Sequence, residues 1–340
     1  MKTLVELTNQ NLISEQDLPL LAQVAEKFDV RITSVVAELL ANDSGGHIAK
    51  QFIPQVEELQ INPQELVDPI GDNKYEKVKG VIHRYPDRCL LKVVSVCPVN
   101  CRFCFRREMM GAVQKSLTQA ELGLAYDYIR SQPQLWEVIL TGGDPLILKP
   151  SSIAKIFASL DSISHLDVVR IHTRVPVVDP ARINSKLIEA LKISKAVYVI
   201  LHANHPAEFT PNSIAACARL VDAGIPMLSQ TVLLKGVNDD EKTLASLMKT
   251  FVRHRIKPYY LHHLDLAKGT GHFRVSIARG QALVKSLQGT ISGLCQPNYM
   301  LEIPGGAGKM PIGPSYIKRE GDKWVVEDYL EQLHDYSELE

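Results

Sequence analysis

The spacing of hydrophobic positions changes character near residue 88. Before it, apolar residues recur every three or four positions, which indicates amphipathic helices. The capping box Ser14-x-x-Asp17 is expected to begin one helix, and a second is expected over 32–40. The prolines and glycine of the stretch over 60–80 interrupt any regular element, so this stretch is predicted to be an arm that wraps the rest of the chain.

After residue 88, short apolar runs alternate with amphipathic segments of helical period. The runs repeat after about thirty residues, which is the length of a βα unit. Six such units predict an α/β fold in which a parallel sheet curls into a partial (β/α)6 barrel. The predicted strands cover 90–96, 137–141, 168–173, 196–202, 226–234 and 258–263. Ligands of such sheets bind at the carboxyl ends of the strands.

The pattern divides the chain into three segments. Residues 1–80 are the helical N-terminal region and arm, 81–300 the partial barrel, and 301–340 a glycine-rich loop with a short C-terminal extension. Within that extension, the apolar run 324–326 beside Gly321 predicts a β-hairpin. A helix between the first two barrel strands is expected to begin at the capping box Thr118-x-x-Glu121.

Composition narrows the class of protein. The 340 residues carry 38 basic and 38 acidic side chains and are 45% hydrophobic, as in a globular protein with a substantial core. Balanced charge gives no field that would attract nucleic acid or an anionic membrane, and no apolar run is long enough to span a bilayer. Six cysteines, three of them clustered, favour a reducing compartment over a disulfide framework, so the protein is predicted to be cytoplasmic.

The three clustered cysteines are Cys97, Cys101 and Cys104, in a CxxxCxxC spacing directly after the first predicted strand. Thiolates suit zinc or iron–sulfur clusters, and a structural zinc site would need a fourth ligand that no second cysteine pair supplies. Three ligands and one open position suit a [4Fe–4S] cluster, although a zinc knob stays an alternative. The spacing resembles that of the radical S-adenosylmethionine enzymes. The resemblance implies that the open iron binds S-adenosylmethionine and that the cluster cleaves it to a 5′-deoxyadenosyl radical.

The residues Gly142-Gly143-Asp144-Pro145 directly follow the second predicted strand, 137–141. Two glycines allow backbone groups to approach a ligand closely, but the same residues are also good β-turn chemistry. In the radical S-adenosylmethionine enzymes a Gly-Gly-acid motif at this position holds the methionine amino group. The position one strand after the cysteines therefore favours the ligand site.

The run Pro304-Gly305-Gly306-Ala307-Gly308-Lys309 contains glycines and a lysine but lacks the GxxxxGK[ST] spacing of a P-loop. A flexible glycine run that ends in one lysine can instead place an amine for a Schiff base with pyridoxal phosphate. The phosphate would need cationic donors, and Arg84, Tyr85 and Arg88 supply two guanidiniums and a phenol before the first barrel strand. Surface ion pairing is the alternative for these arginines.

Together these segments resemble the lysine 2,3-aminomutase family over roughly residues 60–315. The shared motifs are HRYPDR, CFRR after the cysteines, GGDP, IHTRVPVV, NHP, VLLKGVND and PGGAGK. The resemblance implies that Lys309 holds pyridoxal phosphate as an aldimine, and that the substrate displaces Lys309 to form an external aldimine. It also implies that the phosphate is held by Arg84, Tyr85 and Arg88. It implies S-adenosylmethionine contacts from Gly142, Gly143, Asp144, His202 and Gln230.

The resemblance also assigns the substrate site. The residue matching the family's carboxylate-binding arginine is Arg106, and the two family aspartates that hold the distal ammonium match Asp265 and Glu302. Glutamate at the second position retains the charge but lengthens the side chain by one methylene, so lysine is the expected substrate while arginine and ornithine stay open. Residues 311–340 contain no cysteine and thus lack the C-terminal zinc site that supports the oligomer of some family members. A homo-oligomer is therefore expected from the resemblance alone.

The predicted reaction is a radical 1,2-amino shift, most simply L-lysine to β-lysine, in an isomerase that also needs a reductant such as flavodoxin or ferredoxin. A radical S-adenosylmethionine maturase of a peptide or RNA is one alternative, and it would need no pyridoxal phosphate. A redox-sensing iron–sulfur or zinc protein is another, and it would use only the cysteines. Whether β-lysine would be used free or to modify a translation factor stays open.

Overall fold

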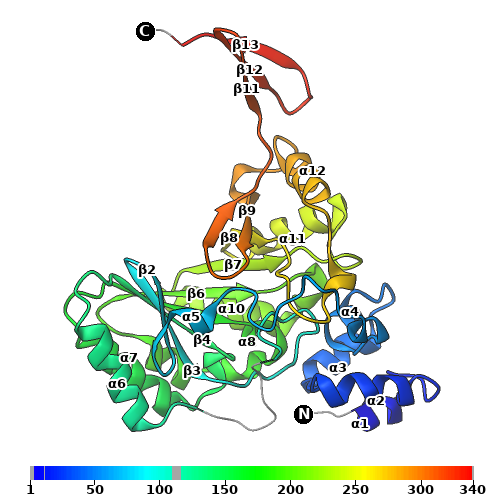
Figure 1. Cartoon of the computed structure of the whole chain (residues 1–340). Coiled ribbons are helices and arrows are strands. Elements are labelled where there is room, and N and C mark those ends of the chain that lie inside the picture. The colour runs from blue at the N-terminus through cyan, green and yellow to red at the C-terminus, as the bar shows by residue number, and fades with distance from the viewer. Residues whose placement is uncertain (1–3, 11, 109–115, 339–340) are drawn as a thin grey trace.

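The computed structural model describes residues 4–10, 12–108 and 116–338. Ten strands form one sheet in which every strand lies beside its neighbour in sequence, from β1 to β10. Figure 1 shows this sheet at the centre of the molecule. Its strands are β1 (Glu76–Val78), β2 (Val81–Tyr85), β3 (Arg88–Val94), β4 (Glu137–Gly142), β5 (Val168–Thr173), β6 (Ala196–His202), β7 (Met227–Val232), β8 (Ile256–His262), β9 (Asn298–Ile303) and β10 (Gly308–Pro311).

The central strands of this sheet are parallel. The six predicted strands correspond to β3–β8, and β5 and β6 have the predicted bounds. The six predicted βα units are confirmed, and β9 pairs in parallel with β8 as a seventh strand that the sequence argument did not include. Its exposed and buried positions are mixed, so it lacks the continuous apolar run that marks the inner strands. Antiparallel strands extend the sheet at its two ends, β2 and then β1 beyond β3, and β10 beyond β9.

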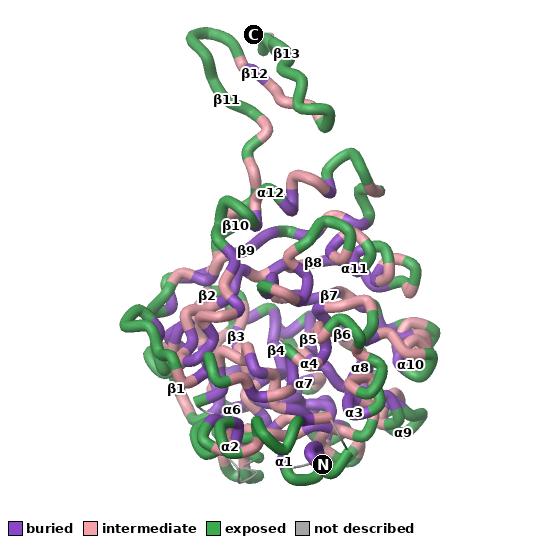
Figure 2. Tube along the Cα trace, turned by 90° about the vertical axis from the view of Figure 1, so that its right-hand side faces the viewer, coloured by how far each residue is buried: buried purple, intermediate pink, exposed green. Residues whose placement is uncertain are grey.

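Helices cover the outer face of the sheet between successive strands. On α11 the residues Leu244, Leu247, Met248 and Phe251 are buried and recur at helical spacing, so one face packs on the core. Figure 2 shows buried residues concentrated along the strands. The covering helices are α6 (Gln119–Arg130), α7 (Pro150–Asp161), α8 (Val175–Val178), α9 (Ser185–Leu191), α10 (Pro211–Asp222), α11 (Glu241–Arg253) and α12 (Ile277–Leu287). The box Thr118-x-x-Glu121 caps α6 as predicted.

The N-terminal region is helical, as the sequence indicates. Helices α1–α4 gather on one side of the sheet, and α5 lies apart from them, next to β2 (Figure 1). One start differs from the prediction: α2 begins at Leu18. Its N-cap Asp17 makes no side-chain cap bond, because the backbone of Asp17 is itself helical and not extended as an N-cap requires. The elements are α1 (Leu4–Asn9), α2 (Leu18–Lys27), α3 (Ser34–Ala41), α4 (His47–Phe52), the 3-10 turn η1 (Val56–Leu59) and α5 (Asp72–Tyr75).

The two edges of the ten-stranded sheet, β1 and β10, do not pair with each other in the part of the chain that the structure describes. The gap is bridged near β10 instead. The Lys309 amide donates to the Tyr85 hydroxyl at 2.9 Å, and the Gly305 amide donates to the Pro69 carbonyl at 3.2 Å. The sheet is therefore an open barrel whose seam is held by the arm and the glycine-rich loop.

A separate three-stranded sheet lies beyond the barrel and projects from it (Figure 1). It consists of β11 (Ile317–Glu320), β12 (Lys323–Glu327) and β13 (Leu333–Tyr336). The predicted hairpin at Gly321 is confirmed by the β11–β12 pair, and β13 adds a strand that the sequence pattern did not indicate. Among the described residues, no helix is long and apolar enough to cross a bilayer.

Candidate active site

One cavity of about 640 Å³ lies within the barrel, and every site residue predicted from the sequence lines it. The cavity runs from the carboxyl ends of the parallel strands towards the seam between β2 and β10. The predicted residues on its wall are Arg84, Tyr85, Arg88, Cys97, Cys101, Cys104, Arg106, Gly142, Gly143, Asp144, His202, Gln230, Asp265, Glu302 and Lys309.

The cysteine loop directly follows β3. Burial, with the nearby acid Asp144 and the other cysteines, raises the pKa of Cys97 well above its usual value, and burial raises that of Cys104 to about 11. These thiols are therefore protonated until a metal displaces the protons. No three His, Cys, Asp or Glu side chains of the described residues converge on a point where they could share a single metal ion. In a [4Fe–4S] cluster each cysteine binds a different iron, so three separated thiols on one cavity wall fit a cluster.

The glycine turn after β4 packs directly against the start of the cysteine loop. The Gly143 amide donates to the Val94 carbonyl at 2.6 Å, and the Asp144 amide donates to the Val96 carbonyl at 3.0 Å. A Cβ on Gly143 would lie 2.1 Å from the Val96 carbonyl oxygen, which excludes any side chain there. Glycine is therefore required at this position for the approach of two backbones.

The Asp144 carboxylate is occupied by protein donors. It accepts hydrogen bonds from the Leu146 amide at 3.0 Å, the Thr173 hydroxyl at 2.8 Å and the Arg174 amide at 2.7 Å. These bonds tie the end of β4 to the end of β5. What the turn offers to a ligand is thus mainly its backbone, and a direct contact of Asp144 with S-adenosylmethionine stays a prediction.

Three half-buried histidines, His172, His202 and His262, line the cavity from different strands. Burial, reinforced by Arg174, lowers the pKa of His202 to about 4, and burial holds the pKa values of His172 and His262 well below the usual value. All three are therefore neutral. Gln230 contacts the His262 ring at 2.7 Å, whereas Nε2 of His172 and of His202 has no partner among the described residues. Covered ring nitrogens without a partner, on residues that line a cavity, fit a site where a polar ligand binds.

The adjacent residues His262 and His263 point to opposite faces, as successive residues of a strand do. His262 lines the cavity, and His263 contacts the Tyr299 hydroxyl at 2.8 Å. The sequence argument assigned no role to His262. His262 lies on the same face of the strand as Tyr260, which also lines the cavity. That alternation along the strand could have identified His262 from the sequence.

Lys309 lies on β10 directly opposite Glu302 on β9. Its ammonium nitrogen is 3.9 Å from one Glu302 oxygen, and the other oxygen is 2.6 Å from the Arg84 guanidinium. Burial lowers the pKa of Lys309, although Glu302 and Asp265 partly oppose the shift. A lysine with a lowered pKa is more readily neutral and nucleophilic, which a Schiff base requires, so the residue fits the predicted role.

The remaining residues predicted to hold the phosphate surround Lys309. The Tyr85 ring lies between two guanidinium groups, with Arg88 at 3.9 Å and Arg84 at 4.9 Å from its centroid. Arg88 also pairs with Asp87 at 2.7 Å. The structure thus brings together the residues predicted to bind the phosphate. It also pairs Arg84 with Glu302, the residue predicted to hold the substrate ammonium.

Arg106, predicted to bind the substrate carboxylate, already holds an acid from the N-terminal arm. Its Nε and Nη2 each lie 2.9 Å from one Asp72 oxygen, and Nη1 donates to the Thr141 hydroxyl at 3.3 Å. Asp72 is buried and lines the cavity. Sequence reasoning missed Asp72, because a residue 34 positions from its partner leaves no local pattern.

Asp265 differs from the other charged residues of the cavity. No hydrogen bond or ion pair of its carboxylate occurs among the described residues. Burial raises its pKa to about 7, an effect that Lys309 partly opposes and Glu302 reinforces. The two acids predicted to bind the substrate ammonium therefore have different environments. Glu302 is paired with cations, whereas Asp265 has no cationic partner among the described residues.

Arg174 is a further residue that the sequence argument did not single out, although it lies within the IHTRVPVV segment. Its Nη1 is 2.9 Å from the Cys101 sulfur, and its Nη2 donates to Glu208 at 2.7 Å. Because its amide also holds Asp144, this residue joins the cysteine loop to the ends of two strands. Only the folded chain shows this junction.

A parallel open barrel, three cavity cysteines and a glycine turn packed on their loop define a radical S-adenosylmethionine enzyme, and residues 91–248 match the family model of the Radical SAM superfamily. The chain is 36% identical to the L-lysine 2,3-aminomutase of Clostridium subterminale over 99% of its own length and 82% of that protein's. It is also 36% identical to the corresponding protein of Methanococcus maripaludis, over 95% and 76%.

The chain belongs to the lysine 2,3-aminomutase family, which confirms the resemblance found in its sequence. It is therefore an aminomutase-type isomerase. A protein named glutamate 2,3-aminomutase in Clostridioides difficile is also 36% identical, over 81% of this chain and 65% of that one. Overall similarity thus does not distinguish the substrates, and the residues of the cavity have to be considered individually.

Proposed function

We propose that this protein moves the α-amino group of L-lysine to the β-carbon and so makes β-lysine. The observation that carries the proposal is the unpartnered Asp265 carboxylate in the cavity. Asp265 is half-buried, and a carboxylate held largely out of water is costly without a cation, which a lysine ε-ammonium would supply. Glu302, which lines the same cavity, adds a second negative group. Arg106 supplies cationic donors for a carboxylate at another part of the wall.

The charges of the cavity argue against an acidic substrate. A glutamate side chain directed at Asp265 and Glu302 would meet like charges in a desolvated site, at a cost of several kcal/mol. A neutral side chain would leave Asp265 without a cation. Arginine and ornithine satisfy the charge requirement, and they stay alternatives because Glu302 is one methylene longer than the aspartate of the family, which changes the depth of the pocket.

When bound, a [4Fe–4S] cluster with S-adenosylmethionine and pyridoxal phosphate would supply radical chemistry and a stabilised amino-group carrier. The residues to hold them are the three cysteines, the glycine turn with His202 and Gln230, and Lys309 with Arg84, Tyr85 and Arg88. The neutral His172 and His202 rings add polar groups without charge. The enclosed wall excludes water from a reactive site.

The remaining expectations are part of the same proposal. A small-molecule substrate and a flavodoxin-like or ferredoxin-like reductant are the proposed partners, with no role for nucleic acid or a membrane. The proposed location is the cytoplasm. A homo-oligomer, and the division into segments 1–80, 81–300 and 301–340, are also proposed on the sequence argument alone.

The test is an anaerobic assay of the reconstituted protein against a panel of amino acids. We expect lysine to be turned over fastest, ornithine or arginine more slowly, and glutamate not at all. Glutamate turnover at or above the lysine rate would contradict the assignment of Asp265 and Glu302. A protein that binds S-adenosylmethionine but shows no pyridoxal absorbance would favour the maturase alternative.

A further inference from the structure

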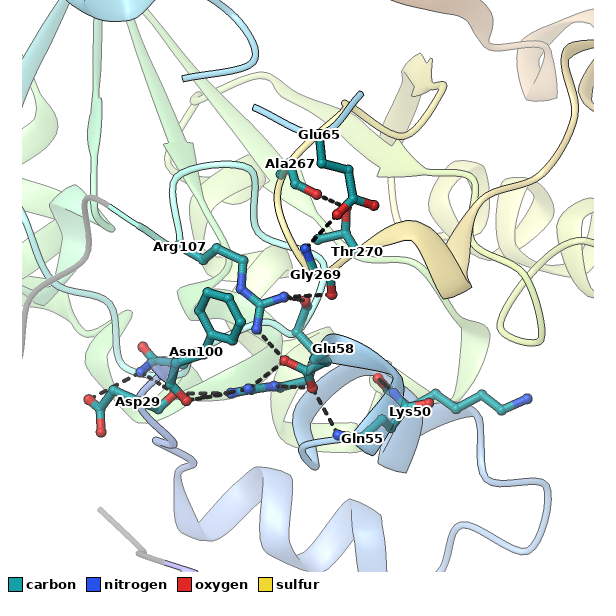
Figure 3. A network of polar contacts seen from close by, with 12 residues as sticks. Asp29, Lys50, Gln55, Glu58, Glu65, Asn100, Arg107, Ala267, Gly269 and Thr270 are labelled. Carbon is teal, nitrogen blue, oxygen red and sulfur yellow. Dashed lines mark hydrogen bonds and ion pairs between the residues drawn. The ribbon is translucent and has the colours of Figure 1, made fainter. Parts of the chain in front are cut away.

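The cysteine loop is held from outside by the N-terminal region. The Asn100 amide donates to the Arg31 carbonyl at 2.9 Å, and the Arg102 amide donates to the Gln51 carbonyl at 2.8 Å. The Asn100 side chain also bonds to Asp29 (Figure 3). The backbone on both sides of Cys101 is therefore fixed by residues far earlier in the chain.

Glu58, on η1, lies at the centre of this contact and is 0% exposed. One oxygen accepts from Arg102 Nε at 2.9 Å and the other from Arg102 Nη2 at 2.7 Å, a two-point pair. Arg107 donates to the second oxygen as well. Glu58 thus binds both guanidinium groups that flank the last two cysteines of the loop, as Figure 3 shows for Arg107.

The two arginines continue the network in both directions. Arg102 donates to the Asp29 carbonyl at 3.0 Å, and Arg107 donates to the Arg102 carbonyl at 2.9 Å and to the Gly269 carbonyl at 3.0 Å. The Gly269 amide in turn donates to Glu65 at 2.8 Å. A single acid therefore closes a network joining the arm, the cysteine loop and the loop that follows Asp265.

We propose that Glu58 is a positioning residue for the iron–sulfur cluster, acting through Arg102 and Arg107 to fix the loop that carries Cys101 and Cys104. Arg102 is adjacent to Cys101, and Arg107 follows Cys104 by three residues. Without Glu58, two buried guanidiniums would repel each other beside the cluster, and the loop would lose the anchor common to both. Groups that orient metal ligands commonly change metal affinity 10–100-fold when removed.

The test uses the full chain with Glu58→Gln, which keeps the size and removes the charge. The matched control is Glu57→Gln, an exposed neighbour on the same 3-10 turn. After anaerobic reconstitution with iron and sulfide, we expect a chelator to strip the cluster from E58Q about tenfold faster or more than from the wild type. The electron paramagnetic resonance spectrum of the reduced cluster should also broaden. E57Q should match the wild type in both measurements.

A Glu58→Asp variant, which restores the charge on a shorter side chain, should recover part of the cluster retention. If E58Q fails to fold, as judged by circular dichroism of the protein before reconstitution, Arg107→Lys replaces it. Lysine retains the charge but has one nitrogen, whereas Arg107 uses two separate nitrogens to reach Glu58 and the two carbonyls. Cluster retention and a spectrum equal to the wild type, in E58Q or in the folded R107K, would overturn the proposal.

The inference rests on the cysteines holding a cluster and not on the identity of the amino acid. A wild-type protein that takes up no cluster would contradict both this inference and the proposed function. A wild-type protein that turns over a different amino acid, with E58Q still losing its cluster, would contradict the substrate assignment alone and support the role of Glu58.

Discussion

Asp265 is the residue at which pH should act on substrate binding. Its pKa of about 7 lies above the ordinary aspartate value because burial disfavours the charged form. Its contribution to stability is therefore fully present below the pKa of the unfolded chain and is lost as the pH rises through about 7. Binding of a cationic side chain has the opposite dependence, because only the ionised carboxylate pairs with it.

We therefore expect the affinity for lysine to rise with pH, by up to about tenfold per unit below pH 7, and to level off above it. Asp265→Asn should weaken lysine binding and flatten this profile while leaving the cofactor spectra unchanged. The measurement is the lysine dissociation constant across pH 7 in both proteins. An equally steep profile in the variant would assign the titration to another group.

Lys309 and Cys101 belong to different ligand sets, so their substitutions should have separable effects. Lys309→Ala is expected to abolish the pyridoxal–lysine absorbance and the amino shift, with S-adenosylmethionine binding intact. Cys101→Ala should lose the cluster and keep pyridoxal phosphate. Absorbance and iron analysis of the two purified variants check this expectation. Normal turnover by Lys309→Ala would contradict the pyridoxal assignment.

Among the elements, the glycine turn after β4 has no room for a side chain at Gly143, where it packs against the cysteine loop. Gly143→Ala would drive a Cβ into the Val96 carbonyl, so we expect a loss of about 1–3 kcal/mol or more in the free energy of unfolding. S-adenosylmethionine binding should weaken with it, because the turn must move.

Gly123→Ala provides the matched control, since Gly123 lies within α6 and nothing is within 4 Å of its added Cβ. That substitution should stabilise the protein by about 0.5–1 kcal/mol, because alanine favours a helix. Thermal unfolding of both variants measures the difference. Equal stability of the two would show that the turn can relax around the added methyl group.

At the scale of the whole molecule, the C-terminal sheet contributes little to the barrel. β11 and β13 are exposed along their length, and the sheet reaches the barrel through contacts such as the pair between Lys285 and Glu327 at 2.7 Å. A chain ending at Gly313 retains the bond from the Ile312 amide to Tyr299. We expect it to unfold near the wild-type temperature and to keep both cofactor spectra. Loss of pyridoxal binding on truncation would show that the sheet supports Lys309.

The sequence alone determined the features that depend on the pattern of residues within one segment of the chain. Apolar runs and caps defined six parallel strands and α6, because strand and helix periods appear within one segment. The cysteine spacing, the glycine turn and PGGAGK identified the cofactor residues, because a loop of fixed length places its own ligands. Their gathering in one cavity followed from the rule that strands of a parallel sheet end at one edge.

Only the tertiary structure decided which charges face one another. Arg106 pairs with Asp72, Arg84 pairs with Glu302, and Glu58 holds Arg102, across 34 to 218 positions of sequence. Such pairs have no period and no fixed spacing, because they arise where the arm and the seam of the sheet fold over the cysteine loop. This packing leaves Asp265 without a cation and buries Glu58 among arginines, although in the sequence both are ordinary acids.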